Sequence, residues 1–153
     1  MRRPEGTRQR PAELYVDCVV LTSFVAEFTF LRNVLGLMGI RMHHAGSLEE
    51  ADFLLTVTGS RVLLADIVFA DGTCYDALGM IGDRHPLVAG LVAADPPDRT
   101  FLQAVFSSGA LGILWKPLEF GLVRKSIRIA HEASTDREVL MEELGVCGVK
   151  GAL

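Results

Sequence analysis

The sequence has few cysteines, and their placement fits neither a disulfide framework nor a zinc site. Cys18, Cys74 and Cys147 lie far apart in a chain of 153 residues. None belongs to a CxxC pair or to a Cys/His pattern with ligand spacing. We therefore expect ordinary thiols that are buried or partly exposed.

Long apolar runs are also missing. No stretch of about 18 residues escapes a charge, a glycine or a polar break, so neither a membrane span nor a signal peptide is visible. This predicts a cytoplasmic protein. Half of the 153 residues are hydrophobic, which allows a sizeable core in one domain and leaves no room for a second full domain.

A general excess of positive charge is absent. The formal net charge is -4 and the isoelectric point is about 5.5, which argues against a body that binds nucleic acid through broad phosphate contacts. Proteins are the expected partners. The one local excess of basic residues is in residues 1–13, where arginines alternate with proline and glycine. We interpret this segment as a flexible basic arm, with non-specific docking to an acidic surface as the alternative.

What the sequence does contain is a regular alternation of two patterns. Short apolar runs rich in β-branched residues, typical of buried strands, alternate with amphipathic stretches typical of helices. The predicted strands are Leu14–Leu21, Ile40–Gly46, Arg61–Phe69, Leu87–Ala94 and Ala110–Trp115. The predicted helices are Phe24–Leu37, a segment capped by Ser47, Tyr75–Ile81, Thr100–Ser108 and Phe120–His131.

This alternation through short loops predicts a three-layer α/β sandwich around a five-stranded parallel sheet, with the functional site at the carboxyl ends of the strands. The alternating part covers residues 14–132. Residues 133–153 form a short helical C-terminal tail, in which Thr135 and Glu138 match a capping box.

Three local matches give this chain a family resemblance. They are VLLADIVFADG around Asp66, GALGILWKPLE around Lys116 and Pro117, and the stretch from Gly39 to Ala51. In this order and spacing they resemble a response-regulator receiver domain of two-component signalling. The resemblance implies a flavodoxin-like (βα)5 topology and no enzymatic activity of the protein's own.

The resemblance assigns roles to three of these residues. Asp66 would be the phosphoacceptor at the end of the third strand, and Lys116 would contact the aspartate or its phosphate. Pro117 would follow a cis peptide bond and orient the loop of Lys116.

The chain departs from the family where the family has two adjacent metal-binding acids. Counting back from Gly39 places these positions at Thr22 and Ser23, whose hydroxyls bind Mg²⁺ poorly. With Asp66 as the one remaining acid, Mg²⁺ binding is expected to be weak or absent. In an alternative register Asp17 is the surviving acid, but this register breaks the pattern of the first strand. Glu27, on the following helix, is interpreted as a solvated surface acid.

The family's signal relay is missing as well. Its Thr or Ser after the fourth strand corresponds to Val92, within one residue, and its aromatic residue in the fifth strand corresponds to Ile113. Val92 has no hydroxyl that could donate a hydrogen bond to a phosphoryl oxygen, and Ile113 lacks the large rotameric swing of Tyr or Phe.

Two functional hypotheses follow from the resemblance. The first is an atypical single-domain receiver in a phosphorelay, which takes phosphate on Asp66 from a histidine kinase and docks through residues 100–131. The alternative is a pseudo-receiver that acts as a protein–protein interaction module without phosphorylation. In either case the partners are a histidine kinase or another signalling protein, with homodimerisation through the C-terminal helices as a further option.

A third hypothesis, a flavin- or nucleotide-binding enzyme, lacks the motif it needs. No glycine-rich phosphate-binding loop follows the first strand, where the sequence reads LTSFVAEF. The adjacent His43 and His44 lie in a predicted strand, so their side chains would point to opposite faces and would not share a metal ion.

Overall fold

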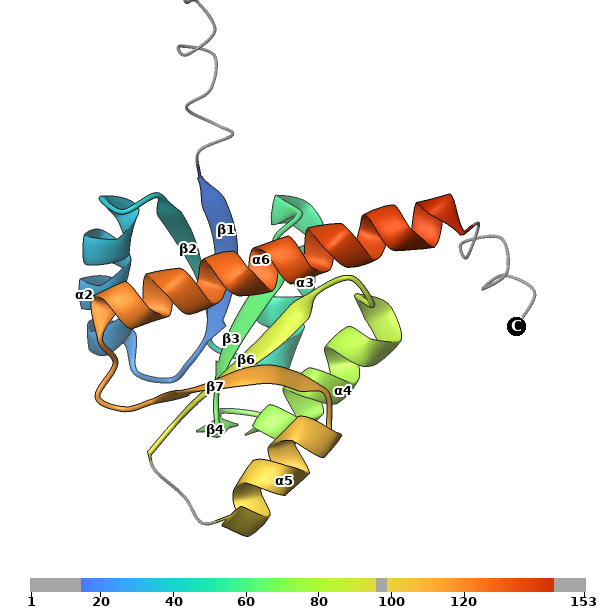
Figure 1. Ribbon diagram of the computed structural model, residues 1–153. Coiled ribbons are helices and arrows are strands. Elements are labelled where there is room, and N and C mark those ends of the chain that lie inside the picture. Colours follow the sequence, from blue (N-terminus) through green and yellow to red (C-terminus); the bar gives the residue numbers. More distant parts are fainter. Residues whose placement is uncertain (1–14, 96–98, 145–153) are drawn as a thin grey trace, which may run out of the picture.

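The computed structural model describes residues 15–95 and 99–144, with only the backbone at residues 99 and 100. Its centre is a parallel sheet of five strands in the order β2-β1-β3-β6-β7 (Figure 1). These strands are β1 (Val16–Leu21), β2 (Ile40–Ala45), β3 (Val62–Asp66), β6 (Ala89–Ala94) and β7 (Ala110–Trp115). The helices of the described part are α2 (Val25–Gly36), α3 (Leu48–Thr58), α4 (Cys74–Arg84), α5 (Arg99–Ser107) and α6 (Phe120–Glu143). The predicted α/β sandwich is confirmed.

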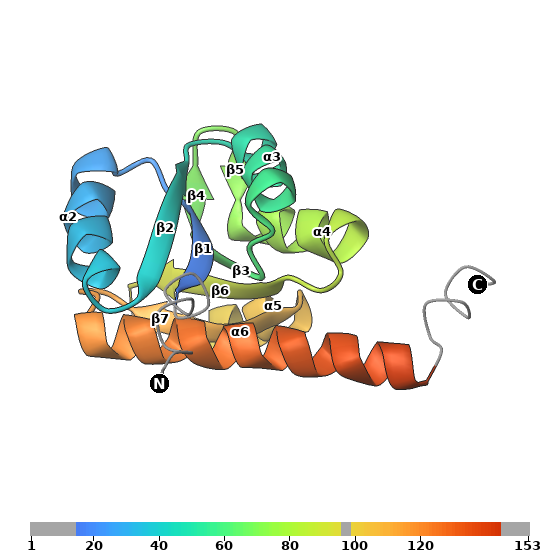
Figure 2. The same cartoon turned by 90° about the horizontal axis from the view of Figure 1, so that it is seen from above.

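Two separate hydrophobic clusters cover the two faces of the sheet. On one face, α2 and α6 pack on alternate residues of β1, such as Cys18 and Val20. On the other face, α3, α4 and α5 pack on the intervening residues, such as Val19 and Leu21 (Figure 2). Burial on both faces explains why the strands read as nearly continuous apolar runs in the sequence.

The predicted strand Arg61–Phe69 is divided in the structure. β3 ends at Asp66, and the short strand β4 (Val68–Phe69) turns back to pair antiparallel with β5 (Gly72–Thr73). Asp71 in the connecting turn accepts hydrogen bonds from the backbone N–H of Leu48 at 2.9 and 3.1 Å, which ties this hairpin to the start of α3. Asp66 is therefore the last residue of a sheet strand.

The predicted break between a helix ending at His131 and a separate tail is wrong. One helix, α6, runs through this boundary to Glu143. Thr135 does not cap a new helix; its hydroxyl donates to the carbonyl of His131 at 3.1 Å, as it can inside a continuous helix. Ser134 is buried and donates to the carbonyl of Leu87 at 2.5 Å, which attaches the extension to the body of the protein.

The predicted basic arm of residues 1–13 and Cys147 lie outside the described residues. Within residues 15–95 and 99–144, no helix combines the length and the apolar character needed to cross a membrane.

Candidate functional site

Thr22, Asp66 and Lys116 meet at the carboxyl edge of the sheet. Thr22 follows β1, Asp66 ends β3 and Lys116 follows β7, and the ends of parallel strands share one edge. The Lys116 Nζ atom lies 3.2 Å from Asp66 Oδ1, within ion-pair distance. The structure thus brings together the two residues that the sequence paired.

Thr22 forms a hydrogen bond with the second oxygen of the same carboxylate. Its hydroxyl donates to Asp66 Oδ2 at 2.5 Å. The Thr22 hydroxyl in turn accepts a hydrogen bond from the backbone N–H of Phe24 at 3.0 Å, so its donor direction toward Asp66 is fixed. Ser23 is exposed, and no hydrogen bond joins it to Asp66 among the described residues. Of the two hydroxyl positions, Thr22 alone contacts the acid.

Asp66 is only 7% exposed, yet both of its oxygens are satisfied. A buried carboxylate is costly unless it is paired and hydrogen-bonded. Here a cation neutralises one oxygen and a hydroxyl satisfies the other. The carboxyl group is therefore held in place from both sides.

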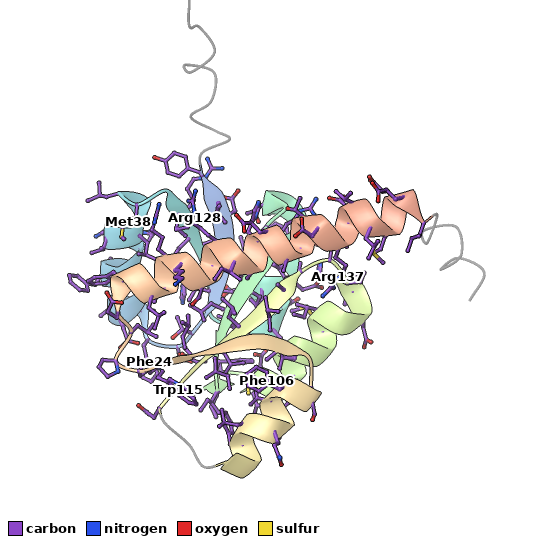
Figure 3. All side chains as sticks on the ribbon, in the orientation of Figure 1. Phe24, Met38, Phe106, Trp115, Arg128 and Arg137 are labelled. Atoms are coloured by element: carbon purple, nitrogen blue, oxygen red, sulfur yellow. The ribbon has the colours of Figure 1, made fainter. Side chains whose placement is uncertain are left out.

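Two further side chains lie close to Lys116. The sequence did not predict their contacts with it. The ammonium lies 5.2 Å from the ring centroid of Phe24, within the range of a cation–π contact. Glu27 is exposed, as predicted, but its Oε1 lies 4.0 Å from Lys116 Nζ. Figure 3 shows Phe24 at the same end of the molecule as Trp115, the residue before Lys116. These contacts depend on side-chain positions that no sequence motif marks.

The peptide bond between Lys116 and Pro117 is cis, as the resemblance implies. The backbone N–H of Lys116 donates to the carbonyl of Ala94 at 2.8 Å, which fixes the start of this loop against the end of β6. Backbone geometry therefore positions the Lys116 side chain over the sheet edge.

At the end of β6, Ala93 lies beside Asp66, within the one-residue margin of the sequence assignment to Val92. Val92 is fully buried in the cluster on the α3 and α4 face. Ala93, the register partner of Asp66, and Ala94 line a pocket of about 310 Å³ together with Asp66 and Lys116. The pocket-lining positions are thus one and two residues after Val92, and they carry no hydroxyl either.

Ile113 is the register partner of Val92 and packs partly buried against the same cluster. Its aliphatic side chain lies on β7 at the position that the resemblance gives to an aromatic residue. A side chain without a ring or hydroxyl has no group to exchange between a buried and an exposed hydrogen-bonding position.

The alternative register through Asp17 is wrong. Asp17 is the second residue of β1, at the amino end of the strand. It forms an ion pair with Arg41 at 3.1 Å and a hydrogen bond with Nε2 of His43 at 3.0 Å. His44 instead contacts the backbone carbonyl of Thr22 at 2.9 Å. The two histidines therefore have different partners, as their positions in a strand predict.

The residues at the site do not fit a Mg²⁺ ion. This ion prefers several oxygen ligands with carboxylates among them. The carboxylate of Asp66 is occupied by Lys116 and Thr22, and no group of three potential His, Cys, Asp or Glu ligands is found in the described part of the chain. No step below depends on a metal ion.

Neither a protein-family model nor a curated protein matches the sequence. Solved structures do match its fold. The signal receiver domain of a Luxo repressor protein from Vibrio parahaemolyticus superposes with a TM-score of 0.74 at 12% identity, over 83% of this chain and 98% of that one. The receiver domain of an HD domain-containing protein from Pseudomonas fluorescens gives 0.73 at 16% identity, over 82% and 93%.

A further structural match is the chemotaxis protein CheY4 from Vibrio cholerae, with a TM-score of 0.68 at 14% identity, over 76% of this chain and 98% of that one. These matches span nearly the whole length of each receiver. The chain therefore has the fold of response-regulator receiver domains.

Proposed function

We propose that this protein is a receiver-type module of phosphorelay signalling that acts through protein–protein contacts without phosphorylation of Asp66. The observation that carries this proposal is the hydrogen bond from Thr22 to Asp66. At a sheet edge where the family has acids, this chain has a threonine hydroxyl that donates a hydrogen bond to the carboxylate of Asp66.

The chemistry of phosphoryl transfer explains why this contact matters. A nucleophilic carboxylate needs an oxygen that can approach phosphorus, and charges that neutralise the phosphoryl oxygens. Here Oδ2 accepts a hydrogen bond at 2.5 Å and Oδ1 is paired with Lys116. One of these two contacts would have to break before an oxygen of Asp66 could approach phosphorus.

An exposed apolar face supports the role of interaction platform. Along α5, β7 and α6 several large apolar side chains are solvent-exposed. They are Phe106, Leu111, Trp115, Leu122 and Ile129. Leu111 and Ile129 also line a groove of about 120 Å³. Exposed large apolar side chains on neighbouring elements are typical of interaction surfaces.

The phosphorylation part of the proposal is tested with small phosphodonors. We expect acetyl phosphate with Mg²⁺ to add no phosphoryl group to the wild type. Neither acetyl phosphate nor the phosphoryl mimic beryllofluoride, each with Mg²⁺, should alter its tryptophan fluorescence. Intact-mass spectrometry detects an added phosphoryl group, and the fluorescence of Trp115 reports a change at the site. A mass increase in the wild type that is lost in Asp66→Asn would contradict the proposal.

Such an increase would support the second candidate function, an atypical phosphoacceptor. The observation in its favour is the pocket of about 310 Å³ that Asp66 and Lys116 line at the carboxyl edge. In that case a histidine kinase is the expected partner.

The partner of the apolar face is proposed to be a second copy of the chain, with another signalling protein as the alternative. Leu122 and Ile129 lie seven residues apart on α6, so they lie on one side of the helix. We expect a dimer in light scattering after size exclusion, and a monomer for Ile129→Glu. Gln103→Glu is the control, because it adds the same charge on exposed α5 without removing an apolar side chain. A monomeric wild type would contradict dimerisation.

A cytoplasmic location and the lack of catalytic activity belong to the same proposal. The receiver fold and the absence of spanning helices in residues 15–95 and 99–144 support the first. The lack of catalytic activity rests on the Asp66 carboxylate, because both of its oxygens already have partners within the chain.

A further inference from the structure

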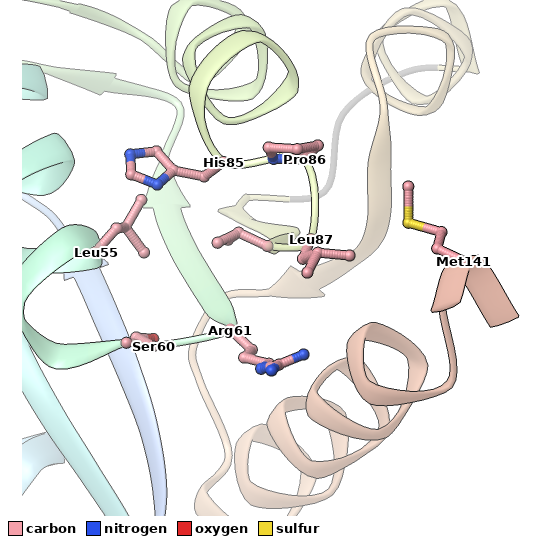
Figure 4. Close-up of a pocket in the computed structure, with 9 residues that line it drawn as sticks. Leu55, Ser60, Arg61, His85, Pro86, Leu87 and Met141 are labelled. Carbon is pink, nitrogen blue, oxygen red and sulfur yellow. The ribbon is translucent and has the colours of Figure 1, made fainter. Parts of the chain in front are cut away.

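A second pocket lies at the amino end of β3, the opposite edge of the sheet from Asp66. Its volume is about 290 Å³. The end of α3, the start of β3, the segment after α4 and the extension of α6 surround it (Figure 4). Most of its wall is apolar, from Leu55, Pro86, Leu87, Val88 and Met141. Met141 reaches the pocket only because α6 continues past His131.

The pocket contains one cation with an unused donor. Arg61 lines it and pairs through Nη2 with Glu138 Oε1 at 2.5 Å. The other terminal nitrogen, Nη1, is buried and has no hydrogen-bond partner among the described residues. A guanidinium carries five N–H donors, and leaving a buried one unpaired is unfavourable. Because Nη1 has almost no solvent-accessible surface, an acceptor from outside reaches it only when the guanidinium moves toward the pocket.

The other polar groups around the pocket are already engaged. The hydroxyl of Ser60 donates to the backbone carbonyl of Asp17 at 3.0 Å. His85 contacts Asp52 through Nε2 at 2.6 Å. The positive field of Arg61 extends to His131, whose pKa is lowered first by burial and then by this charge. The free hydrogen-bonding capacity is thus cationic, beside apolar walls.

We propose that this pocket binds a small monocarboxylic acid with an apolar body. Its carboxylate would accept from Arg61, and its body would pack on Leu55, Leu87 and Met141. A carboxylate matches the planar donor geometry of arginine. A phosphate monoester fits less well, because the apolar wall offers nothing to its remaining oxygens. The volume suits a body of about the size of one aromatic ring.

Benzoate is the probe for this site, and benzamide is its neutral counterpart of the same shape. We expect benzoate to bind the full chain at least about tenfold more tightly, because a hydrogen bond to a charged group is stronger than one between neutral groups. Calorimetry gives the affinities, and NMR should show shifted methyl signals of Leu55, Leu87 and Val88. Equal affinity for both compounds, no binding at millimolar concentration, or binding that leaves these methyl groups unchanged would overturn the proposal.

Two variants should change the affinity for benzoate in opposite directions. Arg61→Gln removes the cation and is expected to weaken binding about tenfold. Glu138→Gln removes the competing carboxylate and should strengthen binding several-fold, which a variant that merely unfolds could not do. Arg41→Gln, at the same end of the sheet but outside the pocket, is the control and should bind like the wild type. If Glu138→Gln does not bind more tightly, or if Arg41→Gln weakens binding as much as Arg61→Gln, the proposal fails.

No residue of this pocket takes part in the Asp66 site, so its test does not depend on the outcome for phosphorylation. The pocket joins the α6 extension to β3 and to the segment after α4. A bound acid would therefore hold the extension against the body of the protein.

Discussion

The two edges of the parallel sheet differ in how their polar groups are satisfied. At the carboxyl edge, both oxygens of Asp66 have partners within the chain. At the amino edge, Arg61 Nη1 and His131 Nδ1 are buried without hydrogen-bond partners in the described residues. The buried polar side chains described at the carboxyl edge are thus paired within the chain, whereas two of those described at the amino edge are not. Fold alone therefore does not locate function.

The largest effect is expected from breaking the ion pair at the carboxyl edge. Lys116→Met leaves the buried carboxylate of Asp66 with the Thr22 hydroxyl as its one remaining partner, and should lower the free energy of unfolding by about 3 kcal/mol. Urea denaturation measures this change. The double variant Asp66→Asn with Lys116→Met should recover part of the loss, because no buried charge remains.

Lys125→Met is the control for this pair. Lys125 is exposed on α6, so its loss should change the unfolding free energy by less than about 0.5 kcal/mol. Equal effects of Lys116→Met and Lys125→Met on the unfolding free energy would show that the ion pair between Lys116 and Asp66 adds no stability.

Restoring an acid at the carboxyl edge should have the next largest effect. Thr22→Asp replaces a hydrogen-bond donor by a second carboxylate beside Asp66, and should destabilise the protein by about 2 kcal/mol at low ionic strength. Millimolar Mg²⁺ should then raise the melting temperature of the variant and leave the wild type unchanged. Ser23→Asp, at the exposed neighbouring position, should be nearly neutral. A wild type that Mg²⁺ stabilises as strongly as Thr22→Asp would contradict our account of this edge.

A smaller effect is expected at the attachment of α6. Ser134→Ala removes the hydroxyl that donates to the carbonyl of Leu87 and should cost about 1 kcal/mol. Amide hydrogen exchange should become faster in residues 134–143 before it does in the sheet. Thr135→Ala loses only a contact within the helix and should leave exchange almost unchanged. Faster exchange in both variants alike would mean that helix propensity, and not the contact with Leu87, sets the local stability.

The smallest effect concerns pH. Burial and the charge of Arg61 lower the pKa of His131 below its usual 6.5, so the unfolded chain takes up a proton before the folded chain does. Stability is therefore complete above about pH 6.5 and falls as the pH drops through this value toward the lowered pKa. His131→Gln should flatten the curve of unfolding free energy against pH between 7.5 and 5.5. An unchanged slope would contradict this assignment.

The sequence predicted the fold well because burial on both faces of a parallel strand produces apolar runs that are easy to recognise. The pairing of Asp66 with Lys116 followed from the position of each residue at the end of a strand. Thr22 was placed correctly by counting from Gly39, although its donation to Asp66 depends on a hydroxyl orientation that only the structure specifies.

Other features had no decisive signal in the sequence. Thr135 followed by Glu138 fits both a capping box and a helix interior, and the buried contact of Ser134 decides between them. Val92 was assigned with a margin of one residue, because register depends on pairing with β3, which the local pattern of β6 does not encode. The pocket of Arg61 combines segments that are distant in the sequence.

The position of α6 has a consequence for synthesis of the chain. Val123, Ile127 and Ala130 cover the side of β1 formed by Val16 and Cys18, among the first strand residues to leave the ribosome. Until more than a hundred further residues are made, this apolar surface lacks the helix that shields it. Nascent chains stopped before residue 123 should therefore be prone to aggregation and depend on chaperones.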